Sequence, residues 1–410
     1  MSVALKTVSK LPDELRLLIY SLNVINDKQQ TKLEHFLAHC DIDWDFFLKR
    51  VIKQHHVVGP VYKNLDRYGN EAIPGFVLNR LQEEHRKNTY QMLAQTAELL
   101  KLLDLFQKNG VKALPFKGPV LGVQLYDDFC MRLSSDLDIV VAPEDLFESE
   151  KMLSNAGYDK IFPELSPKQY ENFLRQGTHL VFLNQKNSIR VELHCKFSRE
   201  HISPLGFYDV WQNRKRVKIG EKQVWSCAPD DRVILLLVHG SIHCWKRVFW
   251  LNDLFLILND YNDLDWERLI RRIESLCIMR MALSSIVLIN ELFGMEIPDK
   301  IHEMAGSDKK ISYIVRMSVQ NIVRTDEILS VHSWTLLNFR LLLAKFYFIP
   351  TICNKIKFVL NLASPRMLDF ECFPLPDTFF PLYYVVKPFA RLFIKFGWIN
   401  SAAVERKMSK

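Results

Sequence analysis

The sequence predicts an α+β fold, in which a small mixed sheet is flanked by N- and C-terminal helical domains. Only 14 glycines occur in 410 residues, and most apolar residues recur at helical spacing, so a fold dominated by sheets is unfavourable. Short runs with strand character gather in about residues 109–200. With 48% hydrophobic residues, the chain is long enough for two or three domains with buried cores.

The first part, residues 1–108, is predicted to be a helical region. Within 31–68, apolar residues three and four positions apart indicate short amphipathic helices. After Pro74, segment 78–110 has the leucine-rich stripe of one long helix, and Asn109-Gly110 is a typical stop signal.

The second part, residues 109–200, is predicted to be an α/β core, because short strand-like runs alternate here with helical segments. The expected elements, in order, are a strand at 111–117, a helix from Pro119 through about Asp127, a strand at 135–142, a helix from Pro143 to Gly157, and strands at 178–185 and 188–195 joined by a turn at Lys186-Asn187.

The third part, residues 201–330, returns to helical periodicity beyond Pro229 and is predicted to be a second helical domain. The remaining residues, 331–410, form a basic, aromatic-rich C-terminal region. It holds 11 Lys and Arg against 4 Asp and Glu, which accounts for the whole formal charge of +7, and 11 of the 27 phenylalanines.

Two interpretations of this C-terminal region stay open. A basic, aromatic segment can lie on an anionic membrane or contact a polyanion. Alternatively, it is a packed helical subdomain whose Lys and Arg stems cover its edges. Its apolar stretches are shorter than the ~20 residues that a membrane-spanning helix needs.

Acidic residues in two predicted strands form the strongest candidate site. Alternation places Asp136 and Asp138 on one face of a strand, with their Cα atoms ~7 Å apart, while the residues between them face the other way. In the last strand of the core, Glu192 shares a face with Arg190 and His194. If the two strands are neighbours, three carboxylates meet in a cluster that can bind two divalent cations such as Mg²⁺ or Mn²⁺.

The turn before the second predicted helix suggests a phosphate site. Lys117 supplies a cation, Gly118 allows close approach of the backbone, and Pro119 opens a helix whose N-terminus attracts anions. A metal cluster and a phosphate site in one domain together indicate phosphate chemistry.

These motifs resemble those of the polymerase-beta-type nucleotidyltransferase superfamily, and especially a bacterial group described only as uncharacterised nucleotidyltransferases. The segments that carry the resemblance are KGPVLGVQLY (117–126), MRLSSDLDIVV (131–141) and RVELH (190–194), and the likeness extends over about residues 35–295. One departure is the distance of Gly118 from Asp136, 18 residues, which is longer than the superfamily's usual spacing. The resemblance implies a nucleotidyltransferase fold, bound metal ions and an NTP donor.

Two further residues near the acidic motif have a functional and a structural interpretation. The resemblance implies that Arg132 lies at the active-site rim, where it pairs with phosphate oxygens; otherwise it forms a salt bridge to Asp127 or Asp128. Ser135 is a candidate for orienting a metal ligand or contacting nucleotide, and is otherwise an ordinary loop residue.

A second set of candidates lies in the third part of the chain. His239, His243 and Arg247 fall on one helix face, so this face could close over the nucleotide. Alternatively, the same residues bond to Asp253 or to backbone carbonyls. A zinc site is not expected, because no Glu or Cys stands at ligand spacing.

The sequence therefore predicts a metal-dependent enzyme that moves an NMP from an NTP to a hydroxyl of a small molecule, saccharide or peptide. Asp136, Asp138 and Glu192 would be its catalytic metal ligands, and Lys117, Gly118, Arg132, Ser135, His239 and His243 would bind nucleotide. The rival predictions are a kinase-like phosphotransferase and a non-catalytic nucleotide-binding scaffold. Nucleic acid is a weaker candidate acceptor, because the core has no basic stripe with interleaved aromatics.

The cysteines and the N-terminus suggest where the protein acts. None of the eight cysteines forms a C-x-x-C pair, and the first 22 residues carry charges throughout, unlike a signal peptide. The expected location is the cytoplasm, with peripheral membrane contact through 331–410 as a further option.

Overall fold

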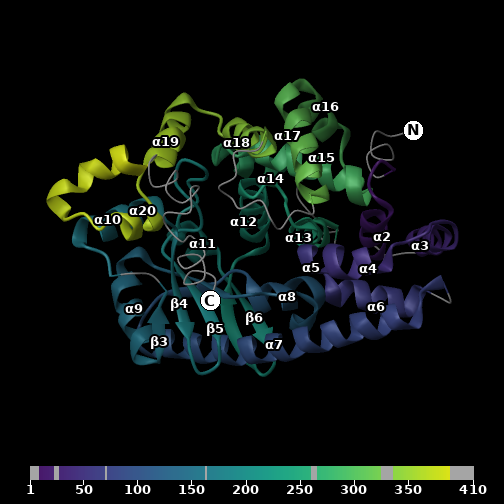
Figure 1. Ribbon diagram of the computed structural model, residues 1–410, viewed down its shortest axis with the longest axis horizontal. Helices are drawn as coiled ribbons and strands as arrows, with labels where there is room; N and C mark the ends of the chain where they lie inside the picture. Colours follow the sequence, from purple (N-terminus) through teal and green to yellow (C-terminus); the bar gives the residue numbers. More distant parts are fainter. Residues whose placement is uncertain are drawn as a thin grey trace.

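The structure, a computed structural model, describes residues 9–22, 27–69, 72–161, 164–259, 266–324 and 336–387. A small five-stranded sheet lies among helices, so the predicted α+β class is confirmed (Figure 1). The strand order is β1-β2-β5-β4-β3, with β2 and β5 parallel and every other pair antiparallel. The strands are β1 Ala113–Pro115, β2 Leu137–Val141, β3 Tyr158–Lys160, β4 His179–Asn184 and β5 Ile189–His194.

The N-terminal part is helical, as predicted. Its elements are α2 Asp13–Leu22, α3 Asp27–His39, α4 Trp44–Phe46, the π-helical η1 Phe47–Ile52, α5 Lys53–His55, α6 Val58–Tyr68 and α7 Gly75–Lys108. Helix α7 runs along one side of the molecule and passes beneath the sheet (Figure 1). Leu99, Leu102 and Phe106 of this helix are buried in one hydrophobic cluster with β2 residues Leu137 and Ile139. The long helix thus supports the apolar face of the sheet.

The elements around the sheet follow the predicted order with additions. They are α8 Gly118–Tyr126, the 3-10 helices η3 Phe129–Met131 and η4 Pro143–Asp145, α9 Leu146–Asn155, α10 Pro167–Gln176, α11 Phe207–Asn213, and the hairpin strands β6 Lys215–Ile219 and β7 Lys222–Ser226. Neither α10 nor the hairpin was predicted from the sequence. The strand KRVKI is mostly exposed and has too few apolar residues to indicate burial on one face.

The helices of the third part are α12 Pro229–Ile242, α13 Val248–Asn259, α14 Trp266–Ser275, α15 Met279–Phe293, α16 Asp299–Ser307 and α17 Lys309–Val323. They share one continuous hydrophobic core with α2, α3 and α6. Helical regions far apart in sequence therefore pack together, while the four-part division of the chain stays a prediction.

The C-terminal elements pack at two places. They are α18 Leu336–Phe348, α19 Ile352–Ala363, α20 Met367–Cys372 and the 3-10 helix η5 Asp377–Leu382. Helix α18 buries Phe348 in the large helical core, whereas Phe370 and Tyr383 form a small cluster with Phe173 of α10. Within the described part of the chain, no helix combines the length and apolarity needed to cross a bilayer.

Candidate active site

Adjacent strands bring the predicted carboxylates together. In the parallel pair β2–β5, Asp138 is the register partner of Glu192, so both side chains project from the same face. Asp136 directly precedes β2 and is two residues from Asp138. The intervening Leu137 is buried on the opposite face, against the α7 cluster. The predicted neighbourhood of the two strands is therefore present.

The Lys117-Gly118 turn lies against this cluster. Lys117 is the N-cap residue of α8, and its Nζ lies 3.1 Å from Asp138 Oδ1. Gly118 has a φ of 60°, which L-residues with a side chain rarely adopt. Ser134 Oγ donates to the Asp136 carbonyl at 2.8 Å, and Ser135 Oγ donates to Asp136 Oδ2 at 3.2 Å. The start of a helix, a lysine and the carboxylates thus share one small region.

Two histidines complete the cluster. His194 Nε2 lies 3.1 Å from Asp138 Oδ1 and 3.6 Å from Glu192 Oε2, and His179 Nε2 also lies 3.6 Å from Glu192 Oε2. Ligand atoms of His179, Glu192 and His194 all lie within 4.8 Å of one another. Oxygen and imidazole donors at this separation fit a divalent ion, so the residues present are suitable for metal binding.

The pKa values of the three carboxyls diverge. Burial and the neighbouring charges of Asp138 and Glu192 raise the pKa of Asp136 to about 6. Burial alone would raise the pKa of Asp138, but Lys117 and His194 outweigh it and lower that pKa. Burial likewise acts against the ionised Glu192, yet the hydrogen bond from His194 and the charge of His179 lower its pKa to about 2. Negative charge is concentrated here, as a cation site requires.

Helix α12 brings His239 and His243 to the same region. Lys117 and His239 line one small cavity together with Phe116. Burial and the charge of Lys117 lower the pKa of His239 well below its usual range, so its imidazole is neutral. Both histidine rings contact Trp250, with ring centroids 5.0 and 5.1 Å from it. His239 thus lies beside Lys117, and nucleotide binding by either histidine stays a prediction.

Arg132 forms a buried ion pair. Its Nε lies 2.9 Å from Asp253 Oδ2, and the two side chains are 5% and 0% exposed. The carboxylate also accepts from Tyr126 at 3.3 Å. The partner of Arg132 is thus Asp253 on α13, and not Asp127 or Asp128 as predicted. Asp253 was predicted as a partner of His239 or His243, but in the structure it pairs with Arg132. The interaction ties the segment before Asp136 to the helical part.

Sequence reasoning missed His179. In the antiparallel β4–β5 pair, His179 is the register partner of His194, so the two rings lie on one face with centroids 4.7 Å apart. The predicted turn at Lys186-Asn187 could have revealed the pairing of these two histidines. In a hairpin, residues equally far from the turn on the two strands lie opposite each other, which places position 179 opposite position 194.

The chain matches a model of a known protein family. The model described as "Uncharacterised nucleotidyltransferase" matches residues 41–294, more than half of the chain. The chain belongs to this family. The matched range includes the complete five-stranded sheet, α7 and helices α12 to α14, and it agrees with the extent of the resemblance in the sequence. No protein with a curated description matches the chain.

Proposed function

We propose that the protein is a metal-dependent nucleotidyltransferase that moves an NMP from an NTP to a hydroxyl acceptor. Membership of a nucleotidyltransferase family supports nucleotidyl transfer in general. One observation supports a metal-dependent reaction: strand pairing places Asp138 opposite Glu192, and Asp136 is two residues away. These carboxylates lie close to Lys117, the residue that precedes α8. Three carboxylates and two imidazoles then surround the place where the triphosphate would lie.

Each residue has a proposed task. Asp136, Asp138 and Glu192 would hold Mg²⁺ or Mn²⁺, with His179 and His194 as further candidate donors. Bound ions would activate the acceptor hydroxyl and stabilise the charge on the leaving pyrophosphate. Lys117 would turn from Asp138 to a phosphate, while backbone N–H groups at the start of α8, near Gly118, would donate hydrogen bonds to phosphate oxygens.

The surrounding residues would complete the nucleotide site. His239 and His243, whose rings contact Trp250, would line the nucleotide site on the side of the helical part. Ser135 would orient the carboxylate of Asp136 through its hydrogen bond. Arg132 acts through its bond to Asp253, by fixing the segment that leads into Asp136. The acceptor hydroxyl attacks the α-phosphorus in line with the leaving pyrophosphate, and Glu192 assists its deprotonation.

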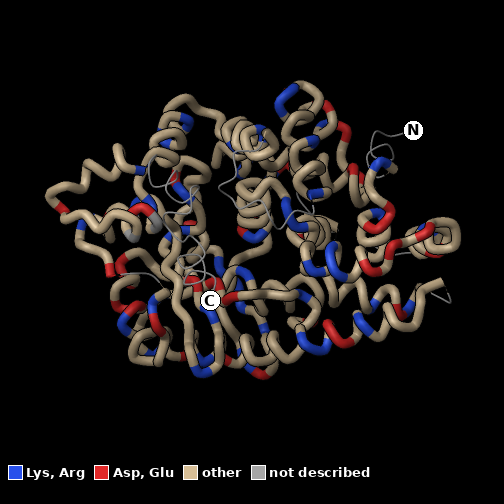
Figure 2. Tube along the Cα trace, in the orientation of Figure 1, with Lys and Arg blue, Asp and Glu red and all other residues tan. Residues whose placement is uncertain are grey.

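Two rival functions remain distinguishable by product. A kinase-like phosphotransferase would release a nucleoside diphosphate, whereas nucleotidyl transfer releases pyrophosphate. A non-catalytic scaffold would bind nucleotide and release neither. A nucleic-acid acceptor is less favoured, because residues of both charge signs are interspersed along the described trace (Figure 2).

We further propose a reducing, cytoplasmic location, which the eight free cysteines support. Contact with an anionic membrane surface is supported by α19, which exposes the apolar residues Ile352, Ile356, Val359 and Leu360. Lys355 and Lys357 lie on the same helix. Flotation of the purified protein with liposomes, with and without anionic lipid, tests this contact; equal recovery in both gradients would contradict it.

The first experiment measures transfer directly. Purified protein is incubated with each α-³²P-labelled NTP, Mg²⁺ or Mn²⁺ and a lysate of the native host, alongside an Asp136→Ala/Asp138→Ala variant. The proposal expects labelled acceptor and pyrophosphate from the wild type, and at least a roughly 100-fold loss in the variant. Asp159→Ala, on the exposed part of β3, is the matched control and should retain activity. Nucleoside diphosphate as the product would instead favour phosphoryl transfer.

A further inference from the structure

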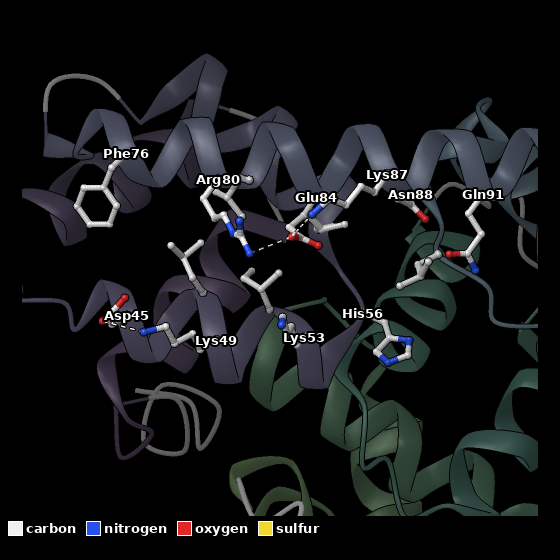
Figure 3. Close-up of a pocket in the computed structure, with 15 residues that line it drawn as sticks. Asp45, Lys49, Lys53, His56, Phe76, Arg80, Glu84, Lys87, Asn88 and Gln91 are labelled. Atoms are coloured by element: carbon white, nitrogen blue, oxygen red, sulfur yellow. Dashed lines mark hydrogen bonds and ion pairs between the residues drawn. The ribbon is translucent and has the colours of Figure 1, made fainter. Parts of the chain in front are cut away.

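A cavity of about 480 Å³ lies between α7 and the segment from Asp45 to Val58 (Figure 3). This volume is within the range of pockets that hold small organic molecules. Both walls lie largely inside the family match, yet none of the residues named in the catalytic proposal lines the cavity.

The rim of the cavity is basic. Lys49 and Lys53 stand on one wall and Arg80 and Lys87 on the facing helix α7, as Figure 3 shows. Two carboxylates, Asp45 and Glu84, pair with three of these cations: Lys49 lies 3.1 Å from Asp45, and both Arg80 and Lys87 contact Glu84. Within the described residues, Lys53 has no carboxylate partner. Arg80 also pairs with Glu83 at 3.2 Å, so four cations stand against three carboxylates. The remaining positive charge, that of Lys53, favours an anionic ligand group at the rim.

The walls between the charged side chains are apolar. The residues that form them are Leu48, Ile52, Val58, Phe76, Leu81 and Leu133. His56 is also neutral at physiological pH, because burial and the charges of Arg247 and Arg132 lower its pKa to about 4. A ligand body that fits these walls is hydrophobic.

The inner end carries one unsatisfied hydrogen-bond acceptor. Asn88 is only 4% exposed, and its Nδ2 donates to the Cys130 carbonyl at 2.6 Å. Because a carbonyl can only accept, this bond fixes the orientation of the amide and leaves Oδ1 as its remaining acceptor. Among the described residues, Asn88 Oδ1 has no partner. A buried acceptor of this kind favours a ligand that presents an O–H or N–H group.

This inner end adjoins the acidic motif. Leu133 lines the cavity and is followed by Ser134, Ser135 and Asp136. Gln91, which also lines the cavity, donates through Nε2 to the Ser134 carbonyl at 2.7 Å. A ligand group at Asn88 therefore lies beside the segment that positions the first catalytic carboxylate.

We propose that this cavity binds the acceptor, an amphipathic molecule with an anionic group at the Lys53 rim, an apolar body along the walls and a hydroxyl directed toward Asn88. The identification of this ligand as the acceptor rests on the proposed nucleotidyl transfer, whereas binding in the cavity can be measured without nucleotide. The acceptor class thereby narrows from any hydroxyl compound to hydroxylated organic anions.

The binding test uses three probes of equal chain length in isothermal titration calorimetry: 10-hydroxydecanoate, decanoate and 1,10-decanediol. The first has both polar groups, and each of the others lacks one. The proposal expects 10-hydroxydecanoate to bind roughly tenfold more tightly than either analogue, as one charge-assisted or one buried hydrogen bond is lost. Equal affinity of decanoate would overturn the Asn88 contact, and equal affinity of decanediol would overturn the basic rim.

Two variants locate the binding. Lys53→Glu should weaken the binding of 10-hydroxydecanoate and decanoate roughly tenfold and leave the affinity for decanediol unchanged. Lys63→Glu makes the same change of charge at an exposed position outside the cavity and should alter none of the three affinities. Leu48→Trp fills the cavity and should weaken all three probes, whereas Leu93→Trp, at an exposed position of α7, should not. Circular dichroism checks that each variant folds. Unchanged affinities in both cavity variants place the binding elsewhere and refute the proposal.

A competition experiment tests the link to catalysis. In the α-³²P assay with host lysate, excess 10-hydroxydecanoate should reduce labelling of the native acceptor in the wild type, and excess decanediol should reduce it much less. Undiminished labelling would overturn the acceptor assignment. An absence of any labelling in the wild type would instead count against nucleotidyl transfer itself, and the calorimetry would still decide whether the cavity binds such anions.

Discussion

The sheet centre and the α7 cavity lie next to each other but differ in charge and in origin. The sheet centre, formed by Asp136, Asp138, Glu192, His179 and His194, concentrates carboxylates on short strands. The cavity has a surplus of cations and is built from helices with apolar walls. Their difference suggests a division of labour in which one region handles cations and phosphate and the other an organic anion.

The two regions meet in one short segment. Cys130 and Ser134 accept hydrogen bonds from α7, while Arg132 between them pairs with Asp253 on α13. The segment from Cys130 to Asp136 is therefore held from both sides. Predictions that disturb each side separately can show whether the two regions depend on each other.

The largest effect on stability is expected at Arg132. Arg132→Met leaves Asp253 buried without its cation, which should cost about 3–5 kcal/mol of unfolding free energy. Arg80→Met in the cavity removes only exposed ion pairs and should cost less than about 1 kcal/mol. Urea denaturation measures both. A double variant, Arg132→Met/Asp253→Leu, should recover much of the loss; equal costs at Arg132 and Arg80 would contradict the assigned difference.

A pH effect is expected on the cavity side. His55 is 1% exposed, its Nδ1 accepts from the Val248 amide at 3.3 Å, and burial lowers its pKa to about 3. Because the unfolded chain binds a proton below about pH 6.5 and the folded chain does not, stability falls as pH decreases from there, by about 1.4 kcal/mol per unit from this group.

The variant His55→Asn isolates this contribution, because the asparagine oxygen can accept the same bond but does not titrate. Between pH 7.5 and pH 5, urea denaturation should show the wild type losing about 2 kcal/mol more than the variant. Parallel losses in the two proteins would show that His55 is not kept neutral by the fold.

A smaller effect is expected on metal choice at the sheet centre. Imidazole favours Mn²⁺ over Mg²⁺, so His179→Gln should weaken Mn²⁺ binding by roughly tenfold and Mg²⁺ binding less. Calorimetric titration with each ion measures this, and His302→Gln on the exposed side of α16 is the control. An equal loss for both ions would argue against His179 as a ligand.

The smallest effect is expected at the turn that precedes α8. Gly118→Ala places a side chain at a φ of 60° and should cost about 1 kcal/mol of stability. Gly75→Ala at the start of α7 introduces no contact within 4 Å, and its φ is not positive, so it should be neutral or slightly stabilising. Thermal unfolding compares the two; equal shifts would show that the backbone at Gly118 adapts.

Local periodicity predicted most of the fold. The stripe of α7, the start of α8 and the alternation in β2 and β5 were all visible, because each depends on neighbours a few residues away. Elements with few apolar residues, such as β6, carried too weak a pattern. The family match confirms the nucleotidyltransferase resemblance that the same motifs suggested.

The sequence by itself determined the faces on which Asp136, Asp138 and Glu192 stand, because side chains alternate along any strand. Only the tertiary structure decided that β2 and β5 pair in a register that joins Asp138 to Glu192, that His179 faces His194, and that Arg132 meets Asp253. The cavity likewise exists only because η1 and α5 pack beside α7. Pairing and packing bring together residues from distant parts of the chain, and their free energy depends on the whole assembly and not on any local pattern.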